Sequence, residues 1–246
     1  MNNMKRLTLL VMLSFGLLFT GCIDIVEEVF INKDGSGKYL VTMDMSSLMG
    51  PEMKGMMQEM MQQEGEDGPS MENIELDSMI YFKDINPEML EELERPDVFK
   101  SAFMHMQMSD SKEMMVIEFG LDFKDISDID YFNKNLDKLG EGNPMGGGID
   151  GGLLPKVDKL FSLNGKTLTR HPTPEGSEMF SDEEMEFASM MFATATYKTV
   201  YHFPGKVKKT SIPGAKIQGN ELVVEESMIN IIKGEAKLDG TIKFKN

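Results

Sequence analysis

The sequence predicts an α+β fold in which a mainly antiparallel β-sheet is covered by a few amphipathic helices. Many short segments alternate apolar and polar residues, as strands with one buried face do. Turn-forming pairs such as Asp34-Gly35 and Asn164-Gly165 join neighbouring segments into hairpins. A few stretches, among them residues 125–139, instead repeat apolar residues at helical spacing.

Residues 1–22 have the layout of an export signal. Lys5 and Arg6 form a short basic segment, and an almost unbroken apolar run follows over residues 7–19. This run is too short, and too closely followed by small residues, to form a stable membrane span. We therefore expect a signal peptide at this end of the chain.

The end of this signal resembles a bacterial lipobox. Residues 18–22 read Leu-Phe-Thr-Gly-Cys, with Phe19 where Leu is more common. The alternative is an ordinary cleaved signal with a chance cysteine after it, but a lone thiol in an exported protein is usually avoided. We expect residues 1–21 to be a lipoprotein signal peptide and Cys22 to be lipidated.

Lipidation would fix the protein to a membrane of the cell envelope. Each buried methylene contributes about 0.8 kcal/mol, so several acyl chains on one residue hold durably. No second apolar run of spanning length follows. We expect residues 22–246 to form one domain at the outer membrane, facing either the periplasm or the cell surface.

The composition limits the partners of this domain. The chain carries a net charge of −16, which becomes −18 without residues 1–21, because these hold two basic and no acidic residues. An acidic membrane surface should repel such a protein except through its lipid. No stripe of Lys or Arg is evident along the sequence, so we expect no nucleic-acid partner.

The first predicted hairpin joins strands over residues 25–32 and 38–45, with Tyr39, Val41 and Met43 on its apolar face. The acidic residues that open it leave two readings. Asp24, Glu27 and Glu28 weakly resemble a surface-export signal of Bacteroidetes lipoproteins, and they also suit the solvated start of a strand.

A methionine-rich stretch over residues 46–63 has the spacing of a helix. Methionine fills cores adaptably, and it also builds yielding surfaces that bind apolar partners. Core packing is the simpler interpretation. The alternative is a ligand-binding face, for which the candidate residues are Met53, Met56, Met57 and Met60. We expect residues 64–73 to form an acidic loop.

The middle of the chain predicts a short strand or connector, a helix and a second hairpin. Their ranges are 79–85, 88–95, and 99–108 with 112–123. Met104, Met106 and Met108 alternate with His105, which raises the hypothesis of a Cu(I) site. Strand periodicity places the three methionines on one face and His105 on the other. We therefore expect a core row of methionines, and no metal site.

The remaining elements include two helices. Residues 125–139 should bury Ile129, Phe132, Leu136 and Leu139, and a helix is also expected over 175–192. Between them lies a Gly-rich loop over 140–152 that lacks the lysine and hydroxyl of a phosphate-binding loop. Further strands are expected over 156–163, 166–170, 195–203, 206–211, 221–226 and 236–244.

The lipobox at Cys22, the hairpin at residues 31–37 and the strand at residues 201–207 together resemble uncharacterised Bacteroidetes lipoproteins. More loosely, the chain resembles the LppM-type domain of bacterial lipoproteins. This resemblance implies a β-rich sheet wrapped with a helix and a lipid-related role. It implies no catalytic residues. The chain differs in its Met-rich and Gly-rich segments.

No catalytic motif accompanies these features. The sequence has no Gly-x-Ser-x-Gly, His-Glu-x-x-His or Ser-x-x-Lys pattern, and its three histidines fall in no recognisable motif. We expect a non-enzymatic protein without a cofactor. The leading hypothesis is a module that binds a lipid or another apolar ligand. The alternatives are a structural or assembly lipoprotein that contacts envelope proteins and a Met/His copper binder.

Overall fold

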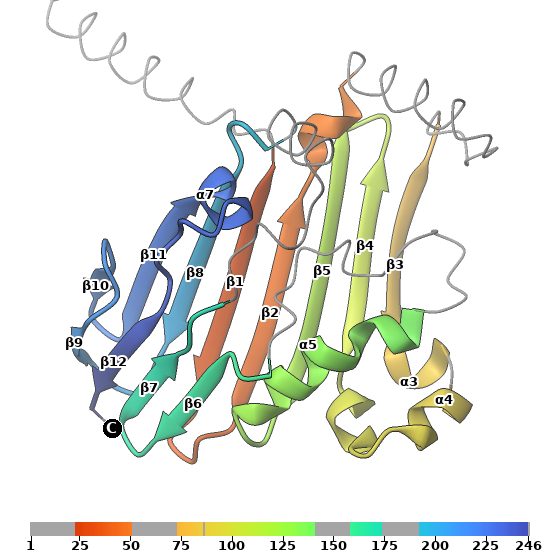
Figure 1. The fold of residues 1–246 in the computed structure, drawn as a ribbon. Helices are drawn as coiled ribbons and strands as arrows, with labels where there is room; N and C mark the ends of the chain where they lie inside the picture. Colours follow the sequence, from red (N-terminus) through yellow and green to blue (C-terminus); the bar gives the residue numbers. More distant parts are fainter. Residues whose placement is uncertain (1–22, 51–72, 86, 141–157, 174–191, 246) are drawn as a thin grey trace, which may run out of the picture.

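The computed structural model describes residues 23–50, 73–85, 87–140, 158–173 and 192–245. Two β-sheets and a few short helices make up this part of the chain (Figure 1). Mainly antiparallel strands with few helices confirm the predicted α+β class.

The larger sheet has eight strands. They are β1 (Asp24–Ile31), β2 (Gly37–Asp44), β3 (Glu75–Tyr81), β4 (Phe103–Ser109), β5 (Met114–Phe123), β8 (Thr196–His202), β10 (Lys216–Gln218) and β11 (Glu221–Ser227). Their order across the sheet is β10-β11-β8-β1-β2-β5-β4-β3. Neighbours run antiparallel except for β1 and β8, which are parallel. The N-terminal strand therefore lies in the middle of the sheet.

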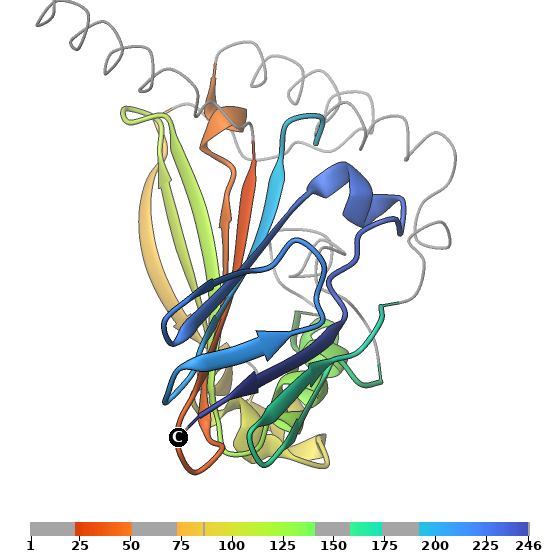
Figure 2. The same ribbon diagram turned by 90° about the vertical axis from the view of Figure 1, so that its left-hand side faces the viewer.

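The smaller sheet has four strands, all antiparallel. They are β6 (Phe161–Asn164), β7 (Thr167–Arg170), β9 (Val207–Thr210) and β12 (Gly240–Phe244), in the order β6-β7-β12-β9. Figure 2 shows this sheet and the helix α5 (Ser127–Gly140) on the same side of the larger sheet. One hydrophobic core contains residues of both sheets and of α5.

The β1–β2 hairpin forms as predicted, because its turn residues satisfy the backbone. Gly35 takes a φ of 88°, and Asp34 Oδ1 accepts hydrogen bonds from the backbone N and the hydroxyl of Ser36 at 3.1 and 2.7 Å. Gly37 is the first residue of β2, and a Cβ there would lie 1.8 Å from the carbonyl oxygen of Phe30. Only glycine fits that position.

The helix α5 confirms the prediction for residues 125–139. Ile129, Phe132 and Leu136 are fully buried against the larger sheet. The carboxylate of Asp128 accepts hydrogen bonds from the backbone N of Lys124 and of Asp125, and so fixes the turn that leads from β5 into the helix.

Five short helices complete the described structure. They are η1 (Ser46–Met49), α3 (Phe82–Ile85), α4 (Pro87–Glu92), η2 (Pro96–Lys100) and α7 (Met228–Ile232). The predicted helix over 88–95 corresponds to α4. Of the methionine-rich stretch over 46–63, only η1 lies within the described part of the chain.

Several predicted boundaries are wrong. Phe99 belongs to η2 and not to a strand, because Pro96 starts a helical turn that buries Phe99 against Phe132. The strand predicted at 79–85 runs over Glu75–Tyr81, and its end is replaced by α3. The predicted strand at 236–244 begins only at Gly240. The strand β10 and the helix α7 were not predicted from the sequence.

A buried polar cluster between the sheets

The centre of the molecule holds a buried ion pair. Glu27 lies on the inner face of β1 with no exposed surface, and Arg170, at the end of β7, is 2% exposed. Arg170 Nη1 donates to Glu27 Oε2 across the space between the two sheets. The expectation of a solvated start to β1 is therefore wrong for Glu27, because its carboxylate points into the core.

Hydroxyl groups surround this pair. Tyr39 on β2 and Thr199 on β8 each donate to the Glu27 carboxylate at 3.0 Å. Arg170 Nη1 also donates to the Tyr201 hydroxyl at 3.1 Å. Three neighbouring strands of the larger sheet and one strand of the smaller sheet thus meet at one polar cluster, which we call the interior cluster.

The tyrosines of the interior cluster and the neighbouring Tyr197 are held in the neutral form. Burial, and then the Glu27 carboxylate, raise the pKa of Tyr39 well above its ordinary value. Burial also raises the pKa of Tyr201 to about 12 and that of Tyr197 further still. Burial alone would lower the pKa of Arg170, but Glu27 holds it well above its ordinary value. The ion pair therefore leaves no net charge.

Two polar side chains beside this cluster lack hydrogen-bond partners in the described part of the chain. They are the hydroxyl of Tyr197 and both amide atoms of Asn133 on α5. Each residue is 2% exposed. Asn133 lies close enough to the Tyr39 hydroxyl to lower its pKa against the larger effect of burial. Arg170 likewise lies close enough to the Tyr197 hydroxyl to lower its pKa, although no hydrogen bond of ordinary geometry joins them. Buried polar groups are nearly always paired with protein, water or a ligand.

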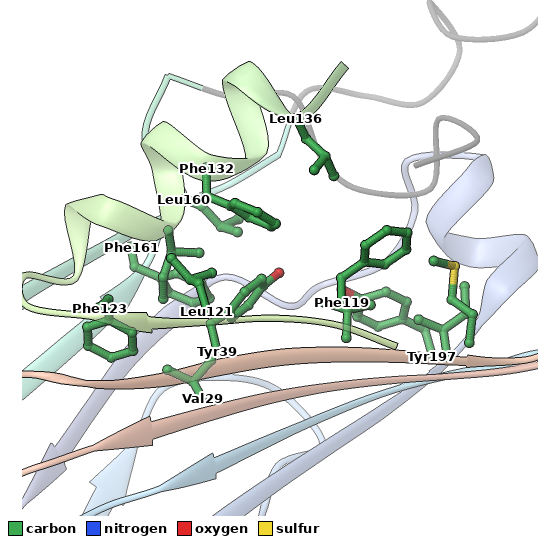
Figure 3. Close-up of a cluster of buried hydrophobic side chains, with 14 of the residues drawn as sticks. Val29, Tyr39, Phe119, Leu121, Phe123, Phe132, Leu136, Leu160, Phe161 and Tyr197 are labelled. Atoms are coloured by element: carbon green, nitrogen blue, oxygen red, sulfur yellow. The ribbon is translucent and has the colours of Figure 1, made fainter. Parts of the chain in front are cut away.

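Apolar side chains enclose these groups. In Figure 3, Tyr39 rises from the sheet toward α5, whose Phe132 and Leu136 point back toward the sheet. Phe161 and Leu160, at the start of the smaller sheet, lie at the same level and are fully buried. The arrangement offers hydrogen-bonding groups of no net charge within an apolar enclosure.

Two surface hollows lie elsewhere. One, of about 400 Å³, includes Thr196, Val223 and Glu225 in its lining. The other, of about 380 Å³, lies where Lys33, Lys124 and other turn residues of both sheets meet. Neither contains a residue of the interior cluster.

One Ser–His pair has the geometry of a catalytic dyad. Ser162 Oγ lies 2.9 Å from His171 Nε2. The nearby Asp130 uses its carboxylate Oδ1 to accept the backbone N of Leu160 and of Phe161, at 2.8 and 3.2 Å. Neither hollow is lined by Ser162 or His171. Among the residues that the structure describes, no carboxylate hydrogen-bonds to the other nitrogen of this imidazole to orient it.

The methionine row and His105 lie where strand periodicity predicts. Met104, Met106 and Met108 are 3–7% exposed on the inner face of β4. His105 points to the outer face, where its Nε2 lies 2.7 Å from Asp77 Oδ1. Within the described residues, no group of three or more His, Cys, Asp and Glu could hold a metal ion.

The other predicted site residues lie outside the described residues. They are Cys22, Met53, Met56, Met57 and Met60. The loops predicted at 64–73 and 140–152 and the helix at 175–192 fall there almost entirely. Among the described helices, none has the length and apolar character that crossing a membrane requires.

The interior cluster was missed from the sequence. The sequence pattern places Glu27 only in an acidic group, and Arg170 only at the end of the strand predicted over 166–170. The signal that could have found Glu27 is alternation, since it occupies the same face of β1 as Ile25 and Val29.

Comparison with known proteins gives one structural similarity. No protein-family profile matches the chain, and no curated protein matches it significantly. The folded domain of LppM from Mycobacterium tuberculosis, solved by NMR, matches with a TM-score of 0.41 and 10% identity, over 94% of this chain and 95% of that one. This agrees with the loose resemblance stated from the sequence, whereas nothing supports an origin in Bacteroidetes. A likeness this weak carries no argument about function.

Proposed function

We propose that this protein is a non-enzymatic lipoprotein of the bacterial cell envelope, anchored through Cys22, whose folded domain binds a lipid or a similar amphiphile. The proposal for the anchor rests on the lipobox-like residues 18–22. The first strand begins at Asp24, so a lipid on Cys22 would hold the domain directly against its membrane. We take the outer membrane as that membrane.

The ligand proposal rests on one observation, which is the pair of unpartnered groups on Tyr197 and Asn133. A buried polar group without a partner costs about 1–3 kcal/mol, so an occupant that bonds to both would be strongly favoured. The surrounding wall is apolar, and Glu27 and Arg170 cancel each other's charge. The ligand that fits has an apolar body and a neutral polar group, such as a hydroxyl, an ester or an amide.

Native mass spectrometry of the chain from Ile23 onward, purified from a bacterial host, tests this proposal. We expect a bound lipid in the wild type and its loss in Tyr197→Phe. The matched control is Tyr81→Phe, because Tyr81 is 42% exposed at the sheet edge. The temperature of thermal unfolding distinguishes a site filled by a ligand from one that is empty or holds only water. If only water or nothing fills the site, Tyr197→Phe keeps or raises the Tm and no mass is lost, which overturns the proposal.

The alternative is an assembly lipoprotein that contacts other envelope proteins. The observation that favours it is β3, an edge strand on which Leu76, Met79 and Tyr81 are 40–47% exposed. Exposed apolar edge strands pair readily with other chains. Crosslinking in the intact envelope from position 79 would recover a partner under this alternative and none under the first proposal. A copper function has less support, because Met106 and His105 lie on opposite faces.

A further inference from the structure

Lysines accumulate on one face of the smaller sheet. Lys209 on β9 lies directly opposite Lys243 on β12. The backbone N of Lys245 donates to the carbonyl of Lys206 at 2.9 Å, which places a second lysine pair beside the first. Lys208 is the extra residue of β9 where the register shifts. All five are exposed. We call them the lysine face.

The lysine face points away from the core. Val207, Ile242 and Phe244 alternate with these lysines and are buried on the other side of the sheet. Figures 1 and 2 show β9 and β12 side by side, with β9 at the edge of the smaller sheet.

Nothing in the described residues neutralises this charge. The strands β6, β7, β9 and β12 contain no Asp or Glu. None of the five lysines forms an ion pair with a described residue. Like charges directly opposite each other destabilise a sheet. An anionic partner would remove this repulsion, although the chain as a whole carries a net charge of −16.

We propose that the lysine face docks onto an anionic phospholipid surface. Clusters of four to eight basic residues are typical of binding to acidic lipids, with about 1 kcal/mol per lysine. Protein interfaces are depleted in lysine and enriched in aromatic residues and Arg. The lysine face consists of lysines and presents no aromatic residue and no Arg. It also lacks the exposed aromatic rings on which nucleobases stack. Neither of the two surface hollows described above includes any of the five lysines.

Binding of the lysine face to an anionic surface would run against the expectation that an acidic membrane surface repels the protein except through its lipid. The five lysines come from two segments that are more than thirty residues apart in the sequence, and only the β9–β12 pairing brings them together. The inference is independent of the interior cluster, because the two sites lie on opposite faces of the smaller sheet.

Cosedimentation with vesicles tests the proposal. The chain from Ile23 onward holds every described element and lacks the apolar signal. We expect it to bind phosphatidylcholine vesicles that contain phosphatidylglycerol, and we expect high salt to abolish this binding. Vesicles of phosphatidylcholine alone should not bind the protein. Lys209→Gln/Lys243→Gln should weaken binding by about fivefold per lysine, or roughly 25-fold. Its Tm should not fall, since it removes a repulsive pair.

The matched control is Lys100→Gln/Lys112→Gln, which changes the net charge by the same amount as Lys209→Gln/Lys243→Gln. Both control lysines are exposed and lie in segments that connect strands of the larger sheet. It should bind nearly as the wild type does. Equal weakening in both double variants would overturn the proposal, as would equal binding to neutral vesicles or none to anionic ones. If sedimentation velocity instead shows a self-associated wild type that Lys209→Gln/Lys243→Gln dissociates, a second copy occupies this face.

Discussion

Arg170 reaches across the core to Glu27, a residue 143 positions earlier in the chain, and both side chains are almost completely buried. Each charge is stable there only because the other is present. Removing one partner of a buried pair leaves the other uncompensated in the interior.

Arg170→Met should therefore lower the free energy of unfolding by about 3 kcal/mol or more. Urea denaturation at neutral pH measures this loss. The double variant Glu27→Leu/Arg170→Met should recover most of it, because no unpaired charge remains. Asp158→Asn is the control, since the Lys134–Asp158 pair is exposed and its removal should leave the midpoint unchanged. If the free energy of unfolding fell equally in Arg170→Met and in the double variant, the loss would not come from an unpaired Glu27 charge.

Alkaline pH should unfold the protein through its buried tyrosines. The unfolded chain ionises Tyr201 near pH 10, whereas the folded chain keeps this proton to about pH 12. Between these values the unfolded state binds fewer protons, so the free energy of unfolding falls as the pH rises. The loss from Tyr201 is roughly 2–3 kcal/mol by pH 12, and Tyr39 and Tyr197 add to it.

Phenolate absorbance and circular dichroism, followed together, test this expectation. Ionisation of the three buried tyrosines should coincide with unfolding, and Tyr201→Phe should make the alkaline transition shallower. Complete ionisation of all five tyrosines in a chain that keeps its folded spectrum would show that the cluster is open to solvent.

The two faces of β4 should respond differently to truncation. Met106→Ala removes a buried side chain and should cost about 2–5 kcal/mol. His105→Ala removes a side chain from the outer face and should cost far less. Neither change should alter Cu(I) retention under reducing conditions. Loss of bound copper in both variants would restore the copper hypothesis.

Cys22→Ser should release the anchor. We expect the wild type to incorporate a labelled fatty acid and to fractionate with the outer membrane, and the variant to do neither. Circular dichroism of the variant should retain the strand signal, because every described element begins after Cys22. A wild-type chain that stays unlabelled would reject the lipoprotein proposal.

Local patterns predicted much of the larger sheet. Alternation placed Tyr39, Val41 and Met43 in the core, and Asp34-Gly35 fixed the first turn. These features depend on near neighbours in the chain. The parallel pairing of β1 with β8 instead joins strands that are far apart in the chain, and no local sequence pattern predicts which distant strand will pair with β1.

The candidate site was harder to predict for the same reason. From its local sequence, Glu27 would be predicted to lie on the surface. Its buried position depends on Arg170 and Thr199, which come from distant parts of the chain. The apolar wall could be predicted from periodicity, as Phe132 and Leu136 show. That the amide of Asn133 has no hydrogen-bond partner among the described residues depends on the packing of α5 over the sheet, which the sequence does not specify.

The central position of β1 has a consequence for folding order. Its first neighbour, β2, follows after a five-residue turn, but its second neighbour begins only at Thr196. Closing so long a loop is slow, because the chain entropy is lost before the contacts form. The middle of the sheet therefore stays open on one side until most of the chain is present, so β1 gains its second neighbour late in folding.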